Sequence, residues 1–264
     1  MGEGTRFCVL HTPPAGMAMR GAILFIHPFA EEINKCRRMA ALQSRAFAAA
    51  GWTVLQVDLF GCGDSSGEFS DVSWARWQED VSEAARWLET RTGLRPVFWG
   101  VRAGCLLALQ AARTASQPAD LLFWQPVLSG KDHFTQFLRL KITGEMLRDA
   151  SERVGAQQLR EQLAQGDLLE VAGYIFSSAL ADGLEEAALD PSAEPMRVAW
   201  LEVTGSSSGE LPPASARCVE RWKEAGHEVS TGVVQGPAFW QTLGITECPA
   251  LVDATLDAIQ PYAR

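Results

Sequence analysis

Short apolar runs alternate with segments of helical spacing along most of this chain. The run Gly21–Phe29 is continuously apolar, which is typical of a strand covered on both faces. Residues Cys36–Ala50 then repeat apolar positions at helical spacing and stop at Gly51, a residue type that often ends helices. The same patterns predict further strands at Arg6–Leu10, Trp52–Asp58, Arg95–Gly100, Asp120–Val127, Arg197–Thr204 and Glu228–Val234, and further helices at Ser73–Arg91, Gly104–Ala115, Pro213–Ala225 and Pro249–Gln260.

The alternation is interrupted once. From Ser129 to Pro195 the apolar positions have helical spacing, as in Phe134–Arg148 and Asp167–Ala181, and no strand is evident. Strands and helices that alternate at these lengths favour an α/β fold with a doubly wound, mostly parallel sheet. We therefore expect a core at residues 1–128 and 196–264, with a helical lid at 129–195 over the carboxyl edge of the sheet, where such folds bind ligands.

One turn between a predicted strand and a predicted helix has the frame of a nucleophile elbow. The segment Trp99–Cys105 reads Gly-x-x-x-Gly around its central residue, but that residue is Arg102. A guanidinium has no lone pair with which to attack a carbonyl, and it keeps its proton in proteins. The loops after the last two strands, Gly205–Glu210 and Gly236–Gln241, contain no aspartate and no histidine, respectively. The sequence thus predicts a hydrolase-like fold without its usual triad.

The four histidines support this conclusion. His227 precedes the last strand and is therefore expected at the opposite end of the sheet, while His11 lies near the N-terminus. The order serine, acid, histidine is impossible in its standard places. If the protein has a catalytic base, it is His27 or His133.

Composition and charge exclude several classes of function. The chain has 264 residues and a net charge of −9, which argues against non-specific binding to nucleic acid or to an anionic membrane surface. Six cysteines form no metal-ligand spacing with histidine, so reduced thiols in a cytoplasmic protein are expected, with no metal and no cofactor. No stretch approaches the apolar length of a membrane span, and no signal-peptide pattern is evident.

Four phrases of the sequence carry a family resemblance. They are HPFAEEINKCRRM (His27–Met39), WGVRAG (Trp99–Gly104), WQPVLSG (Trp124–Gly130) and GPAFWQT (Gly236–Thr242). Through them the chain resembles α/β-hydrolases, and among these the exosortase A system-associated hydrolases of type 2. The resemblance implies a role in exopolysaccharide biosynthesis and export, with protein partners from that system. The arginine in the elbow matches the pattern of this subfamily, so the family name does not itself imply hydrolysis.

Arg102 needs an anion beside it, because it lies at a helix N-terminus, where a cation is disfavoured by roughly 0.3–1 kcal/mol. Two explanations stay open. Either Glu31 or Glu32 pairs with Arg102 in a closed site, or Arg102 clamps the carboxylate or phosphate of a small ligand. Both carboxylates follow an apolar strand whose end meets the same edge of the sheet as the elbow.

Further residues near these positions are candidates for the same site. His27 with Glu31 or Glu32 could move protons as a general acid/base pair. Cys105 is expected to be a buried thiol, and Cys62, in a glycine-rich loop, is expected to be exposed. The other candidates for ligand binding are Phe29, Lys35, Arg38, Val101, Trp124 and Trp240.

Two functions of different kinds therefore remain. The first is a non-catalytic protein that binds a small anionic or acyl ligand through Arg102. The alternative is a hydrolase or acyl-transfer enzyme with relocated catalytic residues, in which His27 and Glu31 or Glu32 would move protons. Loss of the triad positions favours binding.

Overall fold

The protein has an α/β fold built on one large sheet. The computed structural model describes residues 4–115, 119–148, 155–206 and 209–263. Seven strands form the sheet in the order β1-β3-β2-β4-β5-β8-β9, and only β1 runs antiparallel to its neighbour. Their bounds are β1 (Cys8–His11), β2 (Gly21–Ile26), β3 (Trp52–Val57), β4 (Pro96–Val101), β5 (Leu121–Trp124), β8 (Arg197–Thr204) and β9 (Glu228–Gln235). The mostly parallel, doubly wound sheet predicted from the sequence is confirmed.

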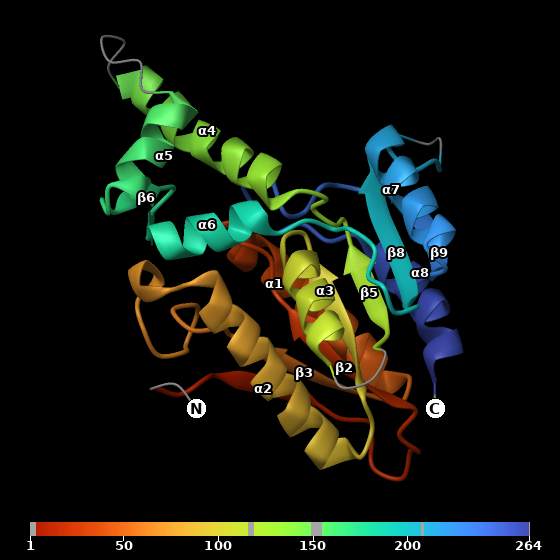
Figure 1. Cartoon of the computed structure of the whole chain (residues 1–264). Helices are drawn as coiled ribbons and strands as arrows, with labels where there is room; N and C mark the ends of the chain where they lie inside the picture. Colours follow the sequence, from red (N-terminus) through yellow and green to blue (C-terminus); the bar gives the residue numbers. More distant parts are fainter. Residues whose placement is uncertain (1–3, 116–118, 149–154, 207–208, 264) are drawn as a thin grey trace. The chain divides into compact units, whose positions relative to one another are not determined.

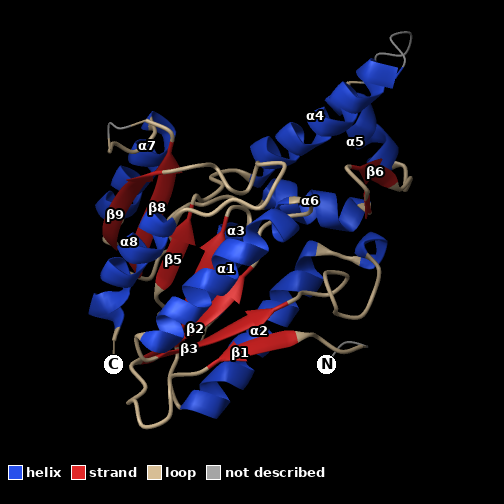
Figure 2. Cartoon of the chain, turned by 180° about the vertical axis from the view of Figure 1, so that it is seen from behind, coloured by secondary structure: helices blue, strands red, loops and turns tan. Residues whose placement is uncertain are grey.

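Helices cover both faces of this sheet. Figure 1 shows α3 and α7 in front of the strands, and Figure 2 shows α1 and α8 over the opposite face. Between these layers β2, β4 and β5 are buried along their whole length, as the apolar run of β2 led us to expect. The bounds of the helices are α1 (Glu32–Ala49), α2 (Trp74–Thr92), α3 (Gly104–Thr114), α7 (Pro213–Glu224) and α8 (Pro249–Ile259), with short 3₁₀ helices η1 (Phe69–Asp71) and η2 (Gln260–Tyr262).

The chain divides into two compact units. The sheet unit comprises residues 8–57, 81–128 and 189–264, and the helical unit comprises residues 1–7, 58–80 and 129–188. The predicted insertion therefore belongs to a unit that also contains the glycine-rich loop after β3. The site developed below lies entirely within the sheet unit.

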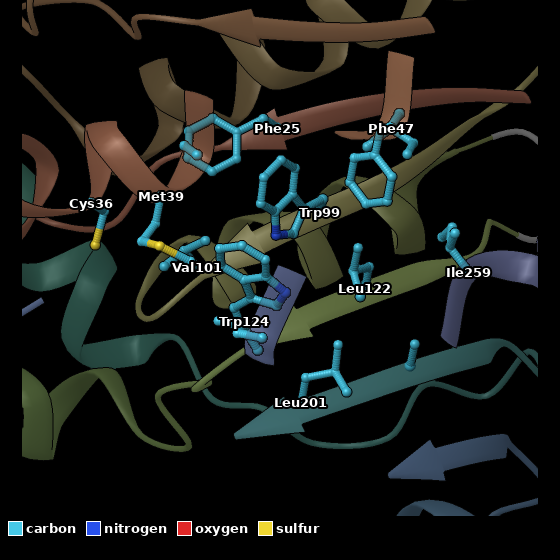
Figure 3. Close-up of a cluster of buried hydrophobic side chains, with 14 of the residues drawn as sticks. Phe25, Cys36, Met39, Phe47, Trp99, Val101, Leu122, Trp124, Leu201 and Ile259 are labelled. Carbon is cyan, nitrogen blue, oxygen red and sulfur yellow. The ribbon is translucent and has the colours of Figure 1, made fainter. Parts of the chain in front are cut away.

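Aromatic side chains fill the core of the sheet unit on the side of α1 and α8. Figure 3 shows Trp99 surrounded by Phe25, Phe47 and Trp124, with ring centroids 4.6, 5.5 and 4.8 Å away. The indole N–H of Trp124 donates a hydrogen bond of 2.9 Å to the hydroxyl of Thr255 on α8. This packing fixes the ends of β2, β4 and β5, from which the site residues project.

Helix α1 begins earlier than its apolar pattern predicts. The pattern starts at Cys36, but the helix starts at Glu32, because the amides of Glu32 and Ile33 already donate to the carbonyls of Phe29 and Ala30. Acidic residues are favoured in the first turn of a helix. The earlier start places Glu32 on a rigid element.

The region 129–195 differs from its prediction as an all-helical segment. It contains α4 (Gly130–Arg148), α5 (Ala156–Ala164) and α6 (Ser178–Glu186), but also an antiparallel pair of strands, β6 (Leu169–Val171) and β7 (Tyr174–Phe176). The helix predicted over Asp167–Ala181 is therefore wrong. Ala172 and Gly173 adopt φ angles of 51° and 83°, which form a two-residue hairpin turn and interrupt any helix.

Cys62 is buried, whereas the glycine-rich loop was expected to expose it. The reason is a tight local turn, in which the Cys62 amide donates to the carbonyl of Leu59 and its own carbonyl accepts from Ser65. Gly61 and Gly63 supply the positive φ angles that such a turn requires. A reactive, exposed thiol at this position is therefore excluded.

Across the described parts of the chain, no helix has both the length and the apolar character needed to cross a membrane.

Candidate functional site

The turn between β4 and α3 has the backbone of a nucleophile elbow. Arg102 occupies its tip with a φ angle of 55°, in the left-handed region that is strained for a residue with a side chain. A Cβ atom at Gly100 would lie 2.6 Å from the Cα of Cys105, and one at Gly104 would lie 2.5 Å from two carbonyl oxygens. Only glycine fits at these two positions, so the Gly-x-x-x-Gly spacing found in the sequence is a requirement of the turn.

Strand β5 and the segment that follows it hold this turn in place. The amide of Arg102 donates to the carbonyl of Trp124 over 2.9 Å, and its carbonyl accepts from the amide of Val127 over 3.3 Å. Both partners belong to β5 or to the segment that follows it. The strained tip is thus fixed by the adjacent strand, and the Arg102 side chain has a defined starting point.

The Arg102 side chain pairs with Glu32. Its Nε lies 3.1 Å from Glu32 Oε1, and both side chains are largely buried, with 13% and 6% of their surfaces exposed. Its Nη1 donates to the carbonyl of Gln125 over 3.3 Å, and the guanidinium lies 5.3 Å from the centroid of the Trp240 ring. One of the two carboxylates proposed from the sequence is therefore the partner of Arg102.

The carboxyl group of Glu32 has a pKa near neutral pH. Burial raises its pKa from 4.5 to about 7, against the opposing attraction of Arg102, and the charge of Glu31 raises it further. Its second oxygen, Oε2, is buried and accepts no hydrogen bond. Burial also raises the pKa of Glu31, and Glu31 Oε2 likewise lacks a hydrogen-bond partner. The site therefore holds two acids that resist ionisation beside the permanently charged guanidinium of Arg102.

A polar chain continues from Arg102 across two further strands. The side chain of Gln125 accepts from the amide of Val203 over 2.8 Å and donates to Glu202 Oε2 over 3.4 Å. Glu202 in turn accepts from the indole N–H of Trp200 over 2.7 Å. A series of polar contacts thus spans the region where β2, β4, β5 and β8 end, and it runs through Glu32, Arg102, Gln125 and Glu202.

Gln125 and Glu202 were missed by sequence reasoning. Each had a signal, because each is a polar residue that interrupts or ends an apolar run, in DLLFWQ and VAWLEV. Gln125 also has a φ angle of 45°, which no sequence pattern indicated. Their connection to Arg102 depends on the order β4-β5-β8 of the strands.

The remaining predicted residues have different surroundings. His27 is buried, and its Nδ1 lies 2.8 Å from the carbonyl oxygen of Pro28. Lys35 is half-buried and its charge acts on both Glu31 and Glu32. Phe29, Val101 and Trp124 are buried, and Arg38 is exposed and pairs with Glu247 over 2.6 Å. The structure thus brings Glu31, Glu32, Lys35, Arg102 and Trp240 together. A catalytic or ligand-binding role stays a prediction for all of these residues.

The loops after β8 and β9, from which the sequence predicts the acid and histidine of a triad to be missing, have the following surroundings. After β9, Phe239 and Trp240 are buried in the core, and the loop after β8 includes residues 207–208, which lie outside the described residues. His227 precedes β9 and accepts from the amide of Met196, just before β8, so it lies at the other end of these strands, as expected. Burial raises the pKa of the Cys105 thiol well above its usual range, so Cys105 is no thiolate nucleophile.

The site can bind charge and exchange a proton, but its tip carries no nucleophile. Arg102 supplies a fixed positive charge, and Glu32 supplies a carboxyl group that changes its protonation near neutral pH. No group of three or more His, Cys, Asp or Glu side chains in the described ranges is arranged to hold a metal ion.

Comparisons with known proteins match this architecture. Residues 3–131 match the family model of X-Pro dipeptidyl-peptidase (S15 family). No curated protein matches the chain in sequence.

Among solved structures, Est1E from Butyrivibrio proteoclasticus with bound ferulic acid is similar, with 15% identity over 98% of this chain and 95% of that one, and a TM-score of 0.63. Butyrate-bound esterase Est2 from Thermogutta terrifontis has 17% identity over 97% of this chain and 88% of its own, with a TM-score of 0.57. DcsB in complex with its substrate analogue has 15% identity over 97% and 99% of the two chains, and a TM-score of 0.57. At these identities the likeness establishes a common fold.

Proposed function

We propose that this chain, which has the α/β-hydrolase fold of these esterases, binds a small anionic or acyl ligand through Arg102 and does not hydrolyse it by a serine mechanism. The observation that carries the proposal is the Arg102 guanidinium at the elbow tip, where esterases of this fold need a nucleophile. An arginine held there by a strained backbone is suited to binding an anion and unsuited to attacking a carbonyl.

A ligand anion competes with Glu32 for Arg102. The pair is 3.1 Å long and uses Nε of the guanidinium, while Nη1 donates to a backbone carbonyl. With a pKa of about 7, Glu32 becomes neutral when a proton is available, and its hold on Arg102 then weakens. An anionic ligand that binds Arg102 would thus replace Glu32 as its partner, and Glu32 would take up a proton at the same time. Ferulic acid and butyrate, bound by the esterases above, are both carboxylic acids.

The biological setting of the ligand follows from the resemblance to exosortase A system-associated hydrolases. Glu32 and Arg102 both lie in phrases that carry this resemblance, HPFAEEINKCRRM and WGVRAG. The ion pair would therefore be a shared trait of that subfamily. We propose that the ligand belongs to exopolysaccharide biosynthesis or export, and that proteins of that system are partners.

Anion binding should appear as thermal stabilisation. We expect sodium butyrate or phosphate, at about pH 6 and constant ionic strength, to raise the Tm of the wild type, because a ligand that binds only the folded state stabilises it by about 2.7 kcal/mol at a hundredfold excess over Kd. Arg102→Ala should lose this response, and Arg221→Ala, which removes an exposed arginine that pairs with Asp190 outside the site, should keep it. An equal rise in Arg102→Ala, or no rise in the wild type, would contradict the proposal.

The alternative function is an enzyme with relocated groups. It is favoured by one observation, the Glu32 pKa of about 7, which suits a general acid or base near neutral pH. In that case Glu32 would exchange protons with the substrate, and His27, which follows the same strand, could assist it.

Serine-type chemistry should be absent in either case. We expect a fluorophosphonate probe to leave the wild type unlabelled in both cases, because the elbow carries Arg102. If the protein only binds its ligand, p-nitrophenyl butyrate should also be hydrolysed no faster than in buffer. Intact-protein mass spectrometry and absorbance measure the two reactions. Stoichiometric labelling of a serine would overturn the proposal. Turnover without labelling that disappears in Glu32→Gln would favour the alternative enzyme.

A further inference from the structure

Strand β9 forms one edge of the large sheet. It pairs with β8 through all eight of its residues, and within the described chain no other strand pairs with it. Figure 2 shows it as the outermost strand on its side of the sheet. Four of its residues, Glu228, Ser230, Thr231 and Gln235, are exposed. Its outer row of backbone amides and carbonyls is therefore available for pairing.

This edge lacks the devices that normally prevent strands from pairing between molecules. Proteins protect such edges with short strands, lysine, proline or bulges. Strand β9 has eight residues, an uninterrupted register with β8, and no charge, proline or lysine from Val229 to Gln235. The opposite edge, β1, has only four residues. Of the two edges, β9 is the one built to accept another strand.

We propose that β9 pairs antiparallel with β9 of a second copy of this chain, so that the two sheets join into one. The faces of the strand limit the register of this pairing. A Cβ at Gly232 would lie 2.6 Å from a methyl group of Leu201, so even-numbered residues of β9 face the layer of α1 and α8. A two-fold axis perpendicular to the sheet keeps each residue on its own face, so only residues of equal parity can lie opposite each other.

A register centred on Thr231 satisfies this condition and pairs like side chains on the odd-numbered face of the strand. It places Thr231 opposite its own copy, Val229 opposite Val233, and Glu228 opposite Val234. Valine pairs and threonine pairs across antiparallel strands are favourable, and like charges directly opposite are unfavourable. The two copies of Glu228, the charged residue of the strand, fall at opposite ends of the interface.

The net charge of −9 on each copy acts against association over longer distances. Salt screens this repulsion but leaves backbone hydrogen bonds and apolar contacts largely intact. The dimer should therefore become tighter as salt is added, opposite to the behaviour of an interface held by ion pairs.

Sedimentation equilibrium at two salt concentrations tests the proposal. We expect the full chain to sediment as a dimer of the 28.7 kDa protomer. Thr231→Lys should weaken the dimer at least about tenfold, because two lysines would face each other at the two-fold axis. Val9→Lys, on the exposed part of the other edge strand, is the matched control and should leave the dimer unchanged. Melts followed by circular dichroism check that each variant is folded.

Cross-linking tests the register directly. Cys8 is exposed and the other five cysteines are buried, so Cys8→Ser with Thr231→Cys leaves one accessible thiol per chain. A short bismaleimide should then join the two copies. A monomeric wild type, or a dimer unchanged by Thr231→Lys, would overturn the proposal. A dimer that Thr231→Lys breaks but that does not cross-link through Thr231→Cys would overturn this register.

Discussion

Replacing Arg102 with alanine should lower the free energy of unfolding by about 3–5 kcal/mol at roughly pH 8.5. At this pH Glu32, with a pKa of about 7, is ionised, and Arg102 is its ion-pair partner at 3.1 Å. The substitution would leave a carboxylate on a residue that is only 5% exposed without its cation. The cost should shrink near pH 5, because Glu32 can then take up a proton and become neutral.

Urea unfolding at the two pH values measures this effect. Arg38→Ala is the matched control, because Arg38 pairs with Glu247 over a shorter distance, 2.6 Å, with side chains that are 49% and 40% exposed. Solvent screens such a pair, so its loss should cost only about 0–1 kcal/mol. If Arg102→Ala costs no more than Arg38→Ala at the higher pH, burial does not strengthen the Glu32–Arg102 pair.

Glu32→Gln should remove a pH dependence of stability worth about 3 kcal/mol. The folded-state pKa of Glu32 is raised from 4.5 to about 7. Below the unfolded value both states hold the proton, and the stability contribution is fully present. As pH rises from 4.5 through the folded pKa, the unfolded state releases its proton first, and this contribution is lost. A glutamine has no proton to release, so the variant should lack this decline.

Unfolding free energies at several pH values between 4.5 and 8 measure the decline. Glu31→Gln is the control, because burial raises the pKa of Glu31 in the same direction as that of Glu32. The Glu31→Gln variant should keep most of the fall in unfolding free energy with rising pH, because Glu32 causes most of it. Equal slopes for wild type and Glu32→Gln would show that Glu32 titrates as an ordinary exposed acid.

The elbow and one end of its ion pair were predictable from the sequence because local requirements specify them. Gly100 and Gly104 are demanded by close backbone contacts within the turn and with the adjacent strand, so their spacing is visible without a structure. Pairing of Arg102 with Glu31 or Glu32 followed from strand ends that meet at one edge. The choice of Glu32 depended on the start of α1, which the apolar pattern placed too late.

Other features depend on geometry that no local pattern encodes. Gln125 and Glu202 join the site because β5 and β8 are neighbours, although the two residues are 77 positions apart in the chain. The strands β6 and β7 were missed because the apolar positions around them also fit a helix. The alternation that identifies β6, with Leu169 and Val171 buried and Glu170 exposed between them, covers only three residues. Hairpin turns at residues such as Ala172 have weak sequence signals when only one of the two positions is glycine.

The position of Glu32 also bears on any attempt to convert this protein into an esterase. Placing a serine at position 102 would restore a hydroxyl to a turn whose backbone is already shaped for it. The negatively charged tetrahedral intermediate of ester cleavage would then form near a carboxyl group that had lost its arginine. Oxyanion sites work by presenting donors to the growing charge, and a carboxylate does the reverse. Catalytic redesign would therefore have to begin on the first turn of α1, and only then at the elbow.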